Sequence, residues 1–88
     1  MFFVLIFCVH GSQASSQSND KKATKRYSQA TELYGQGMRV EALVKLDEAI
    51  RIDADFFDAF MLKGQIFAEL NEWNKGVDAL NRAFEIAP

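Results

Sequence analysis

The last third of the chain repeats apolar residues at helical spacing, and this pattern constrains the fold more than any other feature. Phe60, Gly64 and Phe67 stand four and three residues apart, which places them on one face of a helix. After Asn71 a second stripe follows at the same kind of spacing: Trp73, Val77, Leu80 and Phe84. The stretch therefore predicts a hairpin of two helices with its turn at Asn71.

Two glycines, Gly64 and Gly76, lie where the two predicted helices would face each other. Because glycine has no side chain, two helix backbones can approach closely where glycines meet. Pro88 follows the last apolar residue, at a place where it would end a helix. The sequence therefore predicts close packing at the crossing of this hairpin.

The same pattern occurs 34 residues earlier. Three pairs of identical residues stand 34 positions apart: Leu46 and Leu80, Ala49 and Ala83, and Ile52 and Ile86. At other positions 34 residues apart the residues differ but are of the same class. Small residues correspond to small residues, and turn-forming residues correspond to each other, as Gly37 and Asn71 do. A helix–turn–helix unit that recurs at this period resembles the tetratricopeptide repeat (TPR) family.

The second copy carries more of the TPR pattern than the first. Where the pattern has Trp, Leu, Gly, Tyr, Ala, Phe and Pro, the second copy has Phe60, Lys63, Gly64, Phe67, Gly76, Leu80 and Pro88. Where it has Trp, Gly and Pro, the first copy has Arg26, Ala30 and Ala54. The resemblance covers residues 23–88 and implies two TPR-like repeats, at 23–54 and 57–88. It implies an all-α fold of two stacked helix–turn–helix hairpins, a short right-handed α-solenoid. Two helical hairpins outside the TPR family are the alternative.

Four helices are expected in these repeats. We expect them at residues 23–36, at 39–53, from just after Asp55 to the turn at Asn71, and at 73–86, with Asp55 as the N-cap of the third. In the second helix, the residues expected to face inward are Ala42, Leu43, Leu46, Ala49, Ile50 and Ile52. The apolar residues expected on the third helix are Phe56, Phe57, Phe60, Met61, Phe67 and Leu70.

The chain begins with a continuous apolar run, Phe2 to Val9. The run is too short to span a bilayer, which needs ~20 residues. A short apolar core followed by small residues, here Ser12-Gln13-Ala14, is typical of a secretory signal peptide. We therefore expect residues 1–14 to be a cleaved signal peptide and the protein to be exported, to a periplasm or outside the cell. If the start is misassigned, the protein is cytoplasmic instead.

Two further interpretations concern this region. Lipid attachment at Cys8 is disfavoured, because a lipidated cysteine follows a small residue and Phe7 is bulky. Residues 15–22 are polar and without periodicity, and we expect a disordered spacer there.

The composition argues against catalysis, metal binding and nucleic-acid binding. The formal net charge of −2 lacks the basic excess of a nucleic-acid-binding protein. Cys8 and His10 are the only cysteine and histidine, and both precede the expected cleavage site. The mature chain would therefore have no thiol nucleophile, no Ser-His or Cys-His dyad and no His/Cys metal cluster. We expect a protein that is not an enzyme and needs no cofactor or metal.

The TPR resemblance implies a protein-interaction function. In that family, ligands lie in a concave face lined by the first helix of each hairpin. The corresponding residues of this chain are Tyr27, Thr31, Tyr34, Met61, Leu62, Gln65 and Glu69. Some family members clamp a peptide carboxylate with cations at such positions, and this set contains no cation. We therefore expect a neutral, partly apolar segment of a partner protein. Packing between helices is the alternative role for Tyr27 and Tyr34.

The last predicted helix carries more apolar residues than one hairpin can cover. Its stripe is Trp73, Val77, Leu80 and Phe84. Repeat proteins of this kind usually need three or more repeats, with a polar cap at the end. We therefore expect this stripe to be a face for self-association or for a partner. A structural or oligomerisation role, or a fragment of a longer TPR protein, is the alternative to the interaction module.

Overall fold

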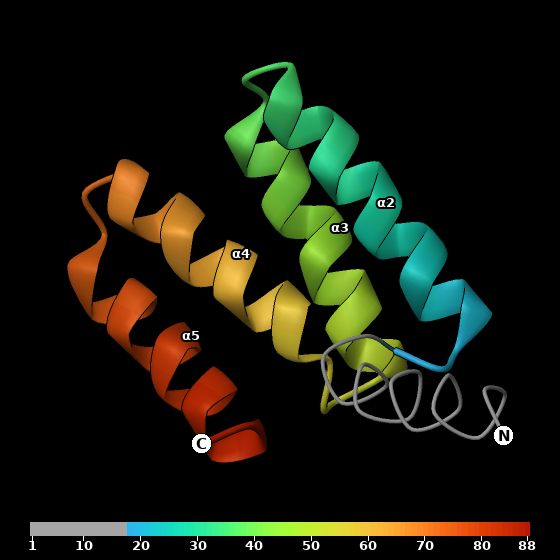
Figure 1. The fold of residues 1–88 in the computed structure, drawn as a ribbon. Coiled ribbons are helices and arrows are strands. Elements are labelled where there is room, and N and C mark those ends of the chain that lie inside the picture. Colours follow the sequence, from blue (N-terminus) through green and yellow to red (C-terminus); the bar gives the residue numbers. More distant parts are fainter. Residues whose placement is uncertain (1–17) are drawn as a thin grey trace, which may run out of the picture.

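The computed structural model describes residues 18–88, and this part of the chain is all α-helical (Figure 1). Four helices follow one another: α2 (Lys21–Gly35), α3 (Arg39–Ile52), α4 (Phe57–Glu69) and α5 (Trp73–Ile86). α2 packs against α3, α4 packs against α5, and α3 packs against α4. The predicted all-α fold of two packed hairpins is confirmed. The expected signal peptide (residues 1–14) and residues 15–17 of the expected spacer lie outside the described residues.

The helix α2 begins at Lys21, two residues earlier than predicted. A carboxylate oxygen of Asp20 accepts hydrogen bonds from the backbone N–H groups of Lys22 (2.8 Å) and Ala23 (3.2 Å). Such a side-chain cap satisfies N–H groups that have no partner within the helix. Lys21 and Lys22, which we expected in the polar spacer, therefore belong to the helix.

Both hairpins turn in the same way, at positions 34 residues apart. Gly37 has φ 80° and Asn71 has φ 62°, the left-handed conformation that favours glycine and tolerates asparagine. The backbone N–H of Met38 donates to the carbonyl of Leu33 (2.9 Å), and that of Glu72 donates to the carbonyl of Phe67 (2.8 Å). These bonds close the end of α2 and of α4 as Schellman motifs. The local geometry of the turn thus recurs with the sequence pattern.

The predicted cap of α4 is wrong. Phe56, not Asp55, is the residue before α4, and its side chain makes no capping bond. The carboxylate of Asp53 instead accepts the N–H of Asp55 (3.0 Å), and the Asp55 carboxylate pairs with Arg82 of α5 (3.1 Å). Asp55 therefore links the α3–α4 connection to α5.

The core is formed by residues of α2, α3 and α4, with Phe56 just before α4, and consists mainly of small residues. Its buried members are Ala23, Ala30, Ala42, Leu46, Ala49, Phe56, Ala59 and Ile66. Ile66, which we did not place inward, is fully buried. Ile52, which we did place inward, is 41% exposed, because it lies at the margin of the α3 stripe in the last turn of that helix.

The predicted close approach at Gly64 and Gly76 is confirmed. A β-carbon added to Gly64 would lie 2.8 Å from the Leu80 side chain and 3.3 Å from the carbonyl oxygen of Gly76. The buried face of α5 consists of Gly76, Ala79 and Ala83, so small residues face α4 across the crossing, together with Leu80 of the apolar stripe.

Among residues 18–88, none of the helices has the length and the apolar character that crossing a membrane requires.

Candidate protein-interaction surface

Side chains from α2, α4 and α5 line an open hollow of about 360 Å³, which we call the groove. Its lining residues are Tyr27, Asp58, Met61, Leu62, Gly64, Gln65, Ala68 and Leu80. Four residues of the predicted concave face therefore lie together here, and Leu80 of the predicted self-association face joins them. Asp58, Gly64 and Ala68 were not among the predicted site residues.

The shape of the groove follows from the residues of α4. Met61 and Gln65 are four residues apart, so they project from the same side of the helix. Gly64 has no side chain there, and Leu80 of α5 reaches its backbone. Met61, Leu62 and Leu80 are partly buried and give the groove an apolar lining.

One edge of the groove combines an aromatic ring with a carboxyl group. The ring of Tyr27 packs against that of Phe56, with 5.1 Å between centroids. Burial raises the pKa of the Tyr27 hydroxyl, and the negative charge of Asp58 raises it further. Burial also raises the pKa of Asp58 above its ordinary value. Tyr27 thus packs against the residue before α4 while also lining the groove.

Tyr34 and Glu69, two other predicted residues, connect the hairpins. The Tyr34 hydroxyl donates to the carboxylate of Glu69, and Gln65 Nε2 donates to the Tyr34 hydroxyl at 2.8 Å. Arg39 Nε donates to Glu69 Oε1 at 2.7 Å. This network ties α2 and the start of α3 to α4. Tyr34 and Glu69 are therefore engaged within the molecule, at one end of the groove.

The residues predicted for the concave face thus lie in different places in the structure. Tyr27, Met61, Leu62 and Gln65 line the groove, whereas Tyr34 and Glu69 belong to the network. Thr31 does neither, because it is exposed and its hydroxyl donates to the Ser28 carbonyl of its own helix (2.8 Å).

Arg39 was missed by the sequence reasoning. It stands 30 residues from Glu69, and no local pattern connects the two residues.

The network predicts a specific dependence of stability on pH. The hydrogen bond from Tyr34, then the bond from Arg39, holds the pKa of Glu69 below its ordinary value. A carboxyl group with a lowered folded-state pKa stabilises the fold above its unfolded pKa, and this contribution disappears as pH falls through the folded pKa. We expect Glu69→Gln to be less stable than wild type at pH 7 and to approach wild type below about pH 4.

Urea unfolding at pH 7 and pH 3 measures this difference. Glu32→Gln, at an exposed position of α2, is the control and should match wild type at both pH values. A Glu69→Gln effect of equal size at both pH values would show that the carboxylate charge is not what stabilises the connection.

The predicted self-association residues lie along α5, and we call them the α5 stripe: Trp73, Val77, Leu80 and Phe84. Three of them are more than half exposed, Trp73 at 62%, Val77 at 54% and Phe84 at 55%. Leu80 is partly buried because it fills the space above Gly64. The stripe and the groove therefore adjoin at Leu80.

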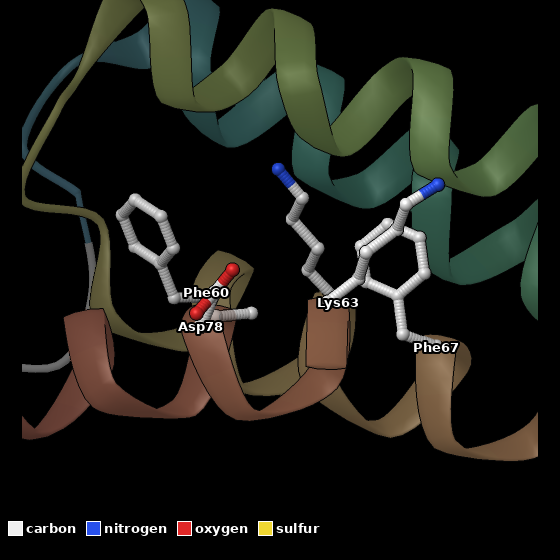
Figure 2. Close-up of a pocket in the computed structure, with 6 residues that line it drawn as sticks. Phe60, Lys63, Phe67 and Asp78 are labelled. Carbon is white, nitrogen blue, oxygen red and sulfur yellow. The ribbon is translucent and has the colours of Figure 1, made fainter. Parts of the chain in front are cut away.

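A second hollow, of about 310 Å³, lies between α4 and α5 (Figure 2). Phe60, Lys63 and Phe67 line it from α4, and Lys75, Asp78 and Ala79 line it from α5. Two ammonium groups approach the Phe67 ring, Lys63 Nζ at 6.0 Å and Lys75 Nζ at 5.8 Å from its centroid. The sequence reasoning missed this combination, since no pattern connects residues of the two helices.

The lysines of this second hollow do not make it an anion site. Lys63 pairs with Asp47 of α3 (2.8 Å), and Lys75 pairs with Glu72 (3.0 Å). Asp78 adds a carboxylate to the lining. The hollow therefore has no surplus positive charge, and the groove is the better candidate for binding.

No protein-family model, curated protein or solved structure matches the chain.

Proposed function

We propose that this protein is a non-enzymatic interaction module of two TPR-like repeats, which binds a neutral, partly apolar segment of a partner protein in the groove. The observation that carries this proposal is the lining of the groove. Apolar side chains, Met61, Leu62 and Leu80, meet there in an open hollow with an amide at Gln65 and a carboxyl at Asp58. Open hollows with an apolar lining and a few polar groups are typical of binding sites.

The repeated geometry supports the TPR-like part of the proposal. The two hairpins turn through left-handed residues 34 positions apart and close their first helices with the same backbone bonds. The period and the helix–turn–helix unit are those of the TPR pattern. In such an array, the first helix of each hairpin lines the inner surface. Tyr27 of α2 and Met61 of α4, which are first helices of their hairpins, both line the groove, and this supports the likeness.

The network beside the groove supports binding without rearrangement. The hydrogen bonds among Tyr34, Gln65 and Glu69 hold α4 against the first hairpin. A site that is already formed loses less conformational freedom when a ligand binds. A partner segment would then be stabilised by burying its apolar side chains against Met61, Leu62 and Leu80.

The proposal predicts a large effect of a charge placed in the groove. A displayed library of peptides selected on the full chain supplies the ligand, and fluorescence anisotropy measures its affinity. We expect Met61→Arg to weaken binding by at least about tenfold, because the arginine would be desolvated among apolar side chains. Met61→Leu keeps the apolar volume, and its affinity should stay near that of wild type.

Met38→Arg is the matched control, because Met38 lies 39% exposed at the α2–α3 turn, away from the groove lining. Circular dichroism checks that all three variants are folded. Equal loss of affinity in Met38→Arg and Met61→Arg, or no loss in Met61→Arg, would contradict the proposed site.

A structural or oligomerisation role is the second candidate function. The exposed α5 stripe favours it, because Trp73, Val77 and Phe84 do not contribute to the groove lining.

A further inference from the structure

The α5 stripe has the spacing of a coiled-coil seam. Its residues follow one another at intervals of four, three and four positions. Apolar residues that alternate in this way form the seam along which a second helix packs, each side chain entering a space between side chains of the partner. Three of the four residues are more than half exposed. The spacing and the exposure of the stripe therefore suit the packing of one further helix against it.

Charged side chains of α5 lie away from this seam. Lys75 and Asp78 line the second hollow, and Arg82 lies over the Phe60 ring, 5.6 Å from its centroid, while pairing with Glu85 of the same helix. The exposed positions directly beside the seam are Asn74 and Asn81, one heptad apart. The seam and its open flank are therefore neutral.

We propose that the partner of the α5 stripe is the α5 helix of a second copy of this chain, packed across a two-fold axis. A two-fold interface brings the same patch of both copies together. A charged residue within it would therefore lie near the same charged residue of the other copy and be repelled by it. The neutral seam and its asparagine flank avoid this repulsion. The inference rests on the second candidate function, oligomerisation, and deepens it by naming the partner of the α5 stripe; it does not depend on binding in the groove.

The exposed surface of α2, in the first hairpin, does not fit the α5 stripe of a second copy. The part of the second hairpin that packs against the first carries the buried residues Phe56, just before α4, and Ala59 and Ile66 of α4. The residues 34 positions earlier are Lys22, Lys25 and Glu32, and all three are exposed. A charged surface of this kind would not cover Trp73 or Phe84. Copies therefore pair stripe to stripe and do not extend head to tail into an open array.

The solution mass of the full chain tests this inference. Sedimentation velocity over concentrations reaching on the order of 1 mM should show the mass rising from 10.0 kDa to twice that value. The double variant Val77→Asn/Phe84→Asn should keep the single-copy mass throughout. Both side chains are more than half exposed, so circular dichroism should show an unchanged fold.

The control is Val44→Asn, a substitution at a valine that is 53% exposed on α3. It should associate as wild type does. Three results would overturn the inference: a wild-type mass that never rises, association that survives in the double variant, or masses that keep growing beyond two copies.

A distance measurement distinguishes the two-fold pair from any other dimer. Spin labels on Asn81→Cys, in a Cys8→Ser background, would lie beside a seam where helix axes are ~8–10 Å apart. Pulsed electron resonance should then report a short distance between copies. Labels on Glu32→Cys of α2 should be much farther apart. A dimer in which the Glu32→Cys labels are the closer pair would contradict pairing through α5.

Discussion

Replacing Ile66 with alanine is expected to lower the free energy of unfolding by about 2–5 kcal/mol. Ile66 is fully buried in the cluster that joins the hairpins, where it lies with Ala23, Ala30 and Leu46. Most buried members of this cluster are alanines fixed in helices, and their short side chains cannot move into the space that the substitution leaves. Urea unfolding followed by circular dichroism measures the loss.

The control for this prediction is Val44→Ala, because Val44 is 53% exposed on α3. It should change the stability by no more than about 0.5 kcal/mol. A domain of this size rarely has more than ~3–5 kcal/mol of stability, so Ile66→Ala is expected to leave much of the chain unfolded at 25 °C. Equal stability of Ile66→Ala and Val44→Ala would show that this cluster does not hold the hairpins together.

Gly64→Val is expected to destabilise the fold by about 1–3 kcal/mol, through overpacking at the crossing of α4 and α5. Even the first added carbon would lie 2.8 Å from Leu80 Cγ and 3.3 Å from the Gly76 carbonyl oxygen. The carbonyl belongs to a helix backbone, so relief requires α5 to move away from α4. The two further methyl carbons of valine make the clash larger, and thermal or urea unfolding measures the cost.

Gly35→Val is the matched control, because a β-carbon at Gly35 would meet nothing within 4 Å. Valine is a slightly better helix former than glycine, so this variant should be as stable as wild type or more stable by a few tenths of a kcal/mol. If Gly64→Val were equally harmless, the two helices could not be as close as the structure places them.

The local features of the fold were predictable from the sequence. The bounds of α5 and the meeting of Gly64 with Gly76 were predicted correctly, because apolar spacing, turn residues and glycines act over short stretches of chain. The start of α2 was placed two residues late, because Asp20 was not recognised as its cap.

Long-range contacts were not predictable in the same way. α4 packs against α5 on one side and against the first hairpin on another, so it has two buried faces. The spacing of Phe60, Gly64 and Phe67 revealed one face, and Ile66 belongs to the other. The pairing of Arg39 with Glu69 depends on how the hairpins stack, which no short pattern records.

The exposure of the α5 stripe follows from the size of the residues beside it. The stripe was expected to be a face for self-association or for a partner, and three of its residues are more than half exposed. Gly76, Ala79 and Ala83 face α4, because small residues let the backbones come close. Because α4 and α5 approach closely through their small residues, Trp73, Val77 and Phe84 stay exposed on the outer side of α5. They are therefore available for another contact.

The methyl resonances of Met61 and Met38 provide the most direct test that the groove binds a protein segment. One methionine lines the groove and the other lies exposed at the α2–α3 turn. During titration with a selected peptide, the Met61 methyl signal should shift in proportion to the peptide bound, while the Met38 signal stays in place. Binding that moves Met38 alone, or that moves neither signal, would contradict the groove as the site.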